Sequence, residues 1–194
     1  MAVELIYETH ATSIDNEAGI ATGWLPGQLS ETGRRQAREL GERRRDQGPA
    51  AVFSSDLRRA VETARLAFDG TGLPHYEDVR LRECDYGELN GAPVARVAAQ
   101  RVHHIDEPFP GGESYRQVVD RTAAFLADLA RDWDGRRVVV IAHSANHWAL
   151  EVLVHGRRLE EFLDVPFAWQ PGWHYRVESG AGGSSALMNP DGGA

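Results

Sequence analysis

Short apolar runs alternate along this chain with segments whose apolar residues recur at helical spacing. The runs are rich in β-branched or aromatic residues, which predicts strands at 3–7, 51–53, 137–142 and 173–177. Apolar spacing and capping residues predict helices at 30–47, after 54–56, at 114–133 and from about 145. Strands that alternate with helices predict a three-layer α/β/α sandwich with a mostly parallel central sheet.

The strongest strand signal is the unbroken apolar run at 137–142, which is typical of the middle of a parallel sheet. Ser30 can cap the helix that Gly48-Pro49 ends. Ser54, Ser55 and Asp56 precede the next helix and can cap it in the same way. Gly70 and Gly72 would end that helix, and a weak extended segment follows near His75.

Two histidines follow predicted strands directly. His10 comes just after the first strand, and His143 follows the strand at 137–142. Ligands of open α/β sheets bind outside the carboxyl ends of the strands, so both imidazoles should lie at one edge of the sheet. Arg59 lies in the first turn of a predicted helix, where backbone N–H groups favour an anion. These residues predict a binding site for an oxyanion.

Composition is that of one soluble globular domain. The chain has 194 residues, 42% of them hydrophobic and 26% charged, and we place the domain at residues 1–178. Residues 179–194 are rich in glycine and serine and are predicted to be a flexible tail. A formal net charge of -8 argues against a nucleic-acid or membrane partner. An anionic substrate therefore has to be bound by a local cluster of positive groups.

Cys84 is the only cysteine, which excludes a disulfide framework and a cysteine-rich zinc site within the chain. The N-terminal segment has neither a basic region nor an apolar stretch long enough for a signal peptide or a membrane span. A cytoplasmic location fits these features best. The sequence leaves the oligomeric state open, with a homodimer as one option.

Sequence motifs add a family resemblance that covers about 175 residues. The segments that carry it are Thr9-His10-Ala11-Thr12-Ser13 with Asn16, residues 54–64 with Arg59, Leu81-Arg82-Glu83-Cys84-Asp85-Tyr86-Gly87, residues 110–114 with Arg121, and His143-Ser144-Ala145. In this order and spacing they resemble the signatures of the histidine phosphatase superfamily, also called the phosphoglycerate mutase-like fold.

This resemblance implies a phosphatase that hydrolyses a small phosphomonoester through a phosphohistidine intermediate. By the family's pattern His10 is the nucleophile, Glu83 is the general acid, and His143 completes the catalytic set. Arg59, His143 and Asn16 would bind the phosphoryl oxygens. The expected partner is a small phosphorylated substrate, and the resemblance implies no metal or organic cofactor. Mutase activity is less favoured, because 194 residues leave little room for insertions over the site.

The chain departs from the family's pattern at the site itself. Thr9 replaces an arginine that binds phosphate in the family, Ala11 and Thr12 replace the next Gly and Glu, and Ser144 stands where the family usually has glycine. We keep Thr9 and Ser144 among the predicted phosphate-binding residues. Loss of one preorganised donor costs about 3–4 kcal/mol, or roughly 100–1000-fold in rate.

These departures leave alternatives open. One hypothesis is that Arg58, Arg82 or a group on the substrate restores the missing charge. Another is that the chain is a degenerate family member that binds a phosphorylated or other anionic ligand without turning it over. A third hypothesis is a metal-dependent hydrolase. In that case His143 and His147, which are spaced i, i+4, would bind zinc together with His10.

Aromatic residues near the C-terminus are predicted mainly to pack in the core. They are Phe167, Trp169, Trp173 and Tyr175, together with Trp24 and Trp148. If they gather near the edge of the sheet that carries His10, they would favour a substrate with an apolar or ring-shaped leaving group.

Overall fold

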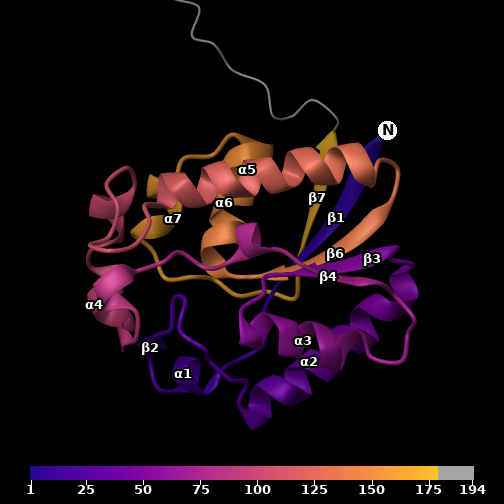
Figure 1. Cartoon of the computed structure of the whole chain (residues 1–194), viewed down its shortest axis with the longest axis horizontal. Helices are drawn as coiled ribbons and strands as arrows, with labels where there is room; N and C mark the ends of the chain where they lie inside the picture. The colour runs from indigo at the N-terminus through magenta and orange to yellow at the C-terminus, as the bar shows by residue number, and fades with distance from the viewer. Residues whose placement is uncertain (179–194) are drawn as a thin grey trace, which may run out of the picture.

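A five-stranded sheet forms the centre of the protein in a computed structural model that describes residues 1–178 (Figure 1). The strands are β1 (Ala2–Thr9), β3 (Ala51–Ser54), β4 (His75–Glu77), β6 (Arg137–Ala142) and β7 (Trp173–Glu178). They lie in the order β4-β3-β6-β1-β7. All neighbours are parallel except β7, which pairs antiparallel with β1 at the edge. The predicted tail at 179–194 lies outside the described residues.

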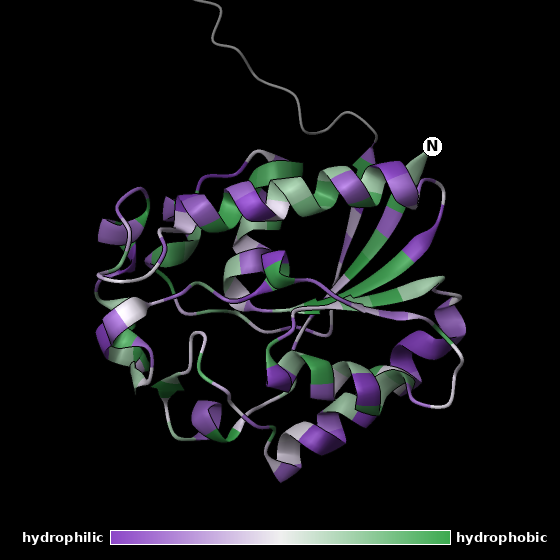
Figure 2. Ribbon diagram, viewed as in Figure 1, coloured by the Kyte–Doolittle hydropathy of each residue, from purple (hydrophilic) through white to green (hydrophobic). Residues whose placement is uncertain are grey.

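Four long helices cover the two faces of the sheet, which confirms the three-layer prediction. They are α2 (Glu31–Arg44), α3 (Arg58–Phe68), α5 (Tyr115–Asp132) and α6 (Ser144–His155). Alternation along β1 assigns the faces, because Leu5 and Tyr7 pack with residues of α5 and α6, whereas Ile6 packs with residues of α2 and α3. The sheet is apolar in the middle, and the helices turn their polar sides outward (Figure 2).

Short elements connect the long helices and strands, and all but η1 lie outside the helices and strands that the sequence predicted. They are α1 (Ile14–Glu17), β2 (Ile20–Ala21), β5 (Ala92–Pro93), α4 (Val94–Ala98), α7 (Glu160–Leu163) and the 3-10 helices η1 (Arg45–Gln47), η2 (Val79–Leu81), η3 (Gly87–Leu89) and η4 (Arg101–His104). Strands β2 and β5 pair with each other. Residues of α1, β2, α4 and η4 line a cavity at the carboxyl ends of β1 and β6.

Predicted helix caps are correct in one case and wrong in another. The Ser30 side chain accepts a hydrogen bond from the backbone N–H of Gly33, at 3.1 Å, and caps α2 as expected. Helix α3 instead begins at Arg58 after Leu57, and no side chain caps it. Ser55 and Asp56 do not cap it because their side chains bind His143 and Arg82. The expected cap is replaced by contacts that build the site.

None of the helices in the described residues combines the length and the apolar character needed to cross a bilayer.

Candidate active site

A cavity of about 390 Å³ opens at the carboxyl ends of β1 and β6. Six of the seven predicted site residues line it. They are Thr9, His10, Asn16, Arg59, Glu83 and Ser144. The seventh, His143, lies directly behind them and is fully buried. The topology therefore brings together residues that are more than 130 positions apart in the sequence, as the strand-end argument predicted.

His10 is held in the orientation that a nucleophile needs. Its backbone N–H donates to the carbonyl of Ala142, at 2.9 Å, which joins the ends of β1 and β6. Its Nδ1 lies 2.7 Å from the carbonyl oxygen of Ala11, so the ring proton belongs on Nδ1 and the lone pair on Nε2. Burial, with a smaller effect of Arg59, lowers the pKa of His10 to about 3. The imidazole is therefore neutral near pH 7.

Arg59 reaches the cavity from the first turn of α3 and is 2% exposed. Its Nε donates to Nε2 of His10 at 3.3 Å, and its Nη2 donates to the carbonyl of Gly23 at 2.8 Å. Gly23 has φ of +53°, and a Cβ there would lie 1.8 Å from Oδ1 of Asn90. Within residues 1–178, no carboxylate forms an ion pair with Arg59. Its positive charge is thus free to bind an anion.

His143 contacts Arg59 rather than the cavity. Its Nδ1 lies 3.3 Å from Nη2 of Arg59, and its Nε2 lies 2.7 Å from the hydroxyl oxygen of Ser55. The Tyr7 hydroxyl donates to the backbone carbonyl of His143. Burial, helped by Arg59, lowers the pKa of His143 well below its usual value. A neutral His143 accepts from Arg59 and donates to Ser55, which fixes the guanidinium beside His10.

Glu83 presents its carboxylate at the amino end of α6. One oxygen accepts from the backbone N–H groups of Cys84, at 2.8 Å, and Ala145, at 3.2 Å. The other accepts from the Ser144 hydroxyl at 3.0 Å. The Trp24 indole N–H donates to the backbone carbonyl of Glu83 at 2.7 Å. Ser144 is a departure from the family's glycine, and here its hydroxyl holds the predicted acid in place.

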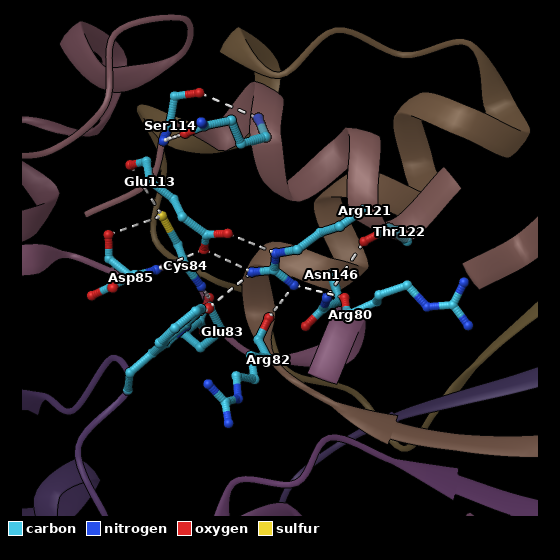
Figure 3. A network of polar contacts seen from close by, with 12 residues as sticks. Arg80, Arg82, Glu83, Cys84, Asp85, Glu113, Ser114, Arg121, Thr122 and Asn146 are labelled. Carbon is cyan, nitrogen blue, oxygen red and sulfur yellow. Dashed lines mark hydrogen bonds and ion pairs between the residues drawn. The ribbon is translucent and has the colours of Figure 1, made fainter. Parts of the chain in front are cut away.

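A partly buried arginine fixes the loop that carries Glu83 (Figure 3). Arg121 on α5 forms two 3.0 Å hydrogen bonds with the Glu113 carboxylate. The same guanidinium donates to the backbone carbonyls of Arg80, Arg82 and Glu83 at 2.7–3.0 Å. The resemblance singled out Arg121 and the segment 110–114, and the structure gives them this task of orienting the loop.

Arg43 and Arg101 also line the cavity, and sequence reasoning missed both. It named Arg58 and Arg82 instead, and neither is among the lining residues. Arg82 is held by both oxygens of Asp56, and its guanidinium lies 4.6 Å from the centre of the Trp24 ring. An arginine in a short 3-10 helix carries no sequence signal that could have placed Arg101 in the cavity.

The predicted aromatic cluster divides between the core and the cavity. Trp148 is buried among residues of α5 and α6, whereas Phe167 and Trp169 line the cavity. Trp169 is 60% exposed, so it forms part of the entrance. The cavity therefore has an aromatic side.

The alternative zinc site does not form from the three predicted histidines. The His147 ring packs 4.2 Å from the ring of Trp173, centre to centre, away from His10 and outside the set of cavity-lining residues. The His143 ring is engaged by Ser55 and Arg59. Across residues 1–178, no group of three His, Cys, Asp or Glu side chains is placed to hold one metal ion.

His147 should make the protein less stable in mild acid. Both ring nitrogens are buried without a hydrogen-bond partner, and burial lowers the pKa to about 4. In the unfolded chain His147 takes up a proton near pH 6.5, whereas in the folded chain it does so only near pH 4. The free energy of unfolding is therefore highest above pH 6.5 and decreases as the pH falls from there toward 4. We expect His147→Leu to reduce the slope of the unfolding free energy against pH by up to about 1.4 kcal/mol per pH unit between these two pH values.

Urea unfolding at pH 7.5 and pH 5 measures this difference. Exposed His155 provides the control, and His155→Leu should leave the pH dependence of the unfolding free energy as it is in the wild type. Parallel pH curves for wild type and His147→Leu would show that His147 does not titrate in this way.

Comparisons with known proteins identify the family of this chain. Residues 9–187 match the family model for the histidine phosphatase superfamily (branch 1). The chain is 34% identical to a 2,3-bisphosphoglycerate-dependent phosphoglycerate mutase of Methylobacterium, over 90% of this chain and 94% of that protein. It is 32% identical to a metal-independent phosphoserine phosphatase of Arabidopsis thaliana, over 72% of this chain and 63% of that protein.

Among solved structures, a mycobacterial glucosyl-3-phosphoglycerate phosphatase bound to VO3 superposes with a TM-score of 0.73. It is 30% identical to this chain, and the match covers 84% of this chain and 87% of the other. Together with the order of the signatures along the sequence, these matches establish that the chain belongs to the histidine phosphatase superfamily.

Proposed function

We propose that this protein is a phosphatase that hydrolyses a small phosphomonoester through a phosphohistidine on His10. The observation that carries the proposal is the environment of His10 Nε2, whose lone pair lies beside the guanidinium of Arg59 in a cavity that also contains Glu83. Relatives named as phosphatases support this class of reaction.

In the first step, Nε2 of His10 attacks phosphorus in line, the N–P bond forms, and the bond to the ester oxygen breaks. Arg59 neutralises the charge on the phosphoryl oxygens, and Asn16 lies in the same cavity to bind them. His143 acts through Arg59, since it contacts the guanidinium and does not line the cavity. The neutral state of His10 leaves a lone pair on Nε2, and this lone pair can attack once the Arg59 Nε–H that donates to it turns to the phosphoryl oxygens.

Glu83 is the proton donor to the departing ester oxygen in this proposal. It then removes a proton from the water that hydrolyses the phosphohistidine, which returns both groups to their starting state. Ser144 and the backbone of Ala145 hold its carboxylate toward the cavity. The role given to Ser144 is thus to position the acid rather than to bind phosphate.

Phosphate release tests the proposal, measured with a chelator present on alkyl phosphates and on p-nitrophenyl phosphate. We expect Glu83→Gln to lower kcat/KM on alkyl phosphates by about 10²–10⁴-fold, because their leaving oxygen needs a proton and kcat/KM reports formation of the phosphohistidine rather than its hydrolysis. The loss should be much smaller on p-nitrophenyl phosphate, whose leaving group departs without one. Exposed Glu88→Gln is the control. Equal losses of kcat/KM on both substrates would contradict the acid role of Glu83. A folded wild-type protein that releases phosphate from none of the substrates would contradict the proposed reaction.

A mutase is the second candidate function. The length of the chain does not argue against it, because the Methylobacterium relative is a mutase that aligns over 94% of its own length. A mutase would return the phosphoryl group from His10 to a second position on the substrate instead of to water. The discriminating assay incubates the protein with a phosphoglycerate in the presence of 2,3-bisphosphoglycerate. Isomerisation faster than phosphate release would favour this candidate.

A degenerate binder is the remaining alternative, and Thr9 is the residue that favours it. Such a protein would bind inorganic phosphate at Arg59 but would release no phosphate from any phosphomonoester. Retention of His10, Arg59, Glu83 and His143 around one site supports turnover, because anion binding alone does not need a nucleophile and an acid.

A further inference from the structure

Trp169 differs from the other tryptophans of the chain, because no ring or cation packs on its indole. Each of the others contacts an aromatic ring or an arginine, and they are Trp24, Trp133, Trp148 and Trp173. Trp169 has no such contact within residues 1–178, although it lines the cavity and is mostly exposed. An indole that lines a cavity without a partner offers a large apolar surface to a ligand.

Two anchors fix the segment that carries Trp169. Before it, Phe167 packs against the buried Trp148 ring, with 6.3 Å between the ring centres. After it, the backbone carbonyl of Pro171 accepts a hydrogen bond from Nη2 of Arg44 at 2.9 Å. Trp169 is therefore held at the cavity by its neighbours along the chain rather than by contacts of its own ring.

The anchor at Arg44 is buried and closely packed. Arg44 donates from Nε to the Glu8 carboxylate at 2.7 Å, and both side chains are almost fully buried. Gly172 has a φ of +79°, and a Cβ at this position would collide with Nη2 of Arg44. Because the segment is fixed to this ion pair, little of its conformational freedom has to be lost when a ligand binds to Trp169.

A second segment also contributes apolar side chains to the cavity. They are Ile20 of β2 and Val94, the first residue of α4. The pairing of β2 with β5 places Ile20 opposite Pro93, which directly precedes Val94. Val94 is exposed, as Trp169 is. The lining of the cavity near solvent therefore includes apolar groups from two separate parts of the chain.

The burial of the lining residues shows which end of the cavity is open. Arg59 and Glu83 are buried, whereas Val94 and Trp169 are exposed. An ester that places its phosphoryl group beside Arg59 therefore has to extend its alcohol part toward the end that Trp169 lines. The cavity volume of about 390 Å³ exceeds what one phosphoryl group fills, so the cavity has room for part of this alcohol.

We propose that the alcohol part of the substrate carries an aromatic ring, which stacks on Trp169 at the open end of the cavity. This inference rests on the proposed phosphatase function and names the substrate class for it. Stacked or edge-on aromatic pairs gain stability beyond the apolar area that they bury. Trp169 is then a specificity-determining residue, while Arg59 binds the phosphoryl group common to all phosphomonoesters.

Matched pairs of substrates test the proposal. Benzyl, 2-phenylethyl and 3-phenylpropyl phosphates are compared with methyl, ethyl and propyl phosphates, so that the two members of each pair differ only in the phenyl ring. We expect wild type to prefer the phenyl member by about tenfold or more in kcat/KM for at least one linker length. Trp169→Ala should reduce this preference by about tenfold, and Trp169→Phe should restore most of it. Val165→Ala is the control, because Val165 is exposed on the same segment and does not line the cavity.

Binding measurements make the test independent of turnover. Phosphonates with a methylene group in place of the ester oxygen are not hydrolysed, and calorimetry gives the affinities of the phenyl and alkyl members. Tighter binding of the phenyl ligand to wild type and Val165→Ala, with a more negative heat-capacity change, but not to Trp169→Ala, supports the proposal even if no ester is cleaved. Equal affinities in the wild type at every linker length, or an unchanged preference in Trp169→Ala, overturn it while leaving the phosphatase proposal in place. Thermal unfolding of each variant confirms that the fold is intact.

Discussion

Replacing His10 by alanine is expected to lower kcat by at least about 10⁴-fold, because it removes the atom that forms the covalent bond. The loss should be the same for good and poor leaving groups, since every ester has to pass through the same phosphohistidine. Phosphate release measured over long incubation checks the size of the effect.

The fold should tolerate this change. His10 donates from its ring only to the carbonyl of Ala11, and its backbone bond to Ala142 does not need the side chain. His155→Ala, at an exposed position in the last turn of α6, is the matched control and should keep wild-type activity. Turnover by His10→Ala above about one-tenth of wild type would show that another group is the nucleophile.

Replacing Arg59 by glutamine is expected to cause the second large loss. The guanidinium is a preorganised charged donor in a buried site, and removal of one such group costs about 100–1000-fold in rate. The chain lacks the family's other arginine at position 9, so no neighbour on β1 replaces the lost charge. We expect kcat/KM to fall by about 10³-fold and the affinity for inorganic phosphate to fall with it.

The neighbouring Arg58→Gln is a close control, because Arg58 is exposed and lies next to Arg59 on the same helix. Arg59→Lys keeps the charge and should recover part of the phosphate affinity. A loss in Arg58→Gln as large as that in Arg59→Gln would mean that Arg58 supplies charge to the site, as the sequence allowed. Thermal unfolding separates these effects from loss of the Gly23 contact.

Strand ends were the part of the site that the sequence predicted best. A short apolar run followed by a histidine places that histidine at the edge of the sheet, and His10 and His143 both lie there. The distinction between them was beyond the sequence. His10 lines the cavity and His143 lies behind Arg59, because Ser55 and Arg59 take up both of its ring nitrogens.

Tertiary contacts explain what the sequence pattern could not predict. Ser55 and Asp56 look like helix caps in sequence, yet both side chains bind partners far along the chain. Ser144 looks like the loss of a glycine, and its hydroxyl holds Glu83. Arg101 enters the cavity only because the segment 94–104 folds back over Trp148. Each contact depends on packing between segments that local propensity does not encode.

The most direct test of this account is to trap the covalent intermediate. Wild-type protein mixed with a labelled phosphomonoester, quenched in alkali within the first turnover and digested, should carry an acid-labile, base-stable phosphate on the peptide that contains His10. His10→Ala should carry none under the same conditions. Rapid phosphate release without any label on that peptide, or a label on a different residue, would contradict the account.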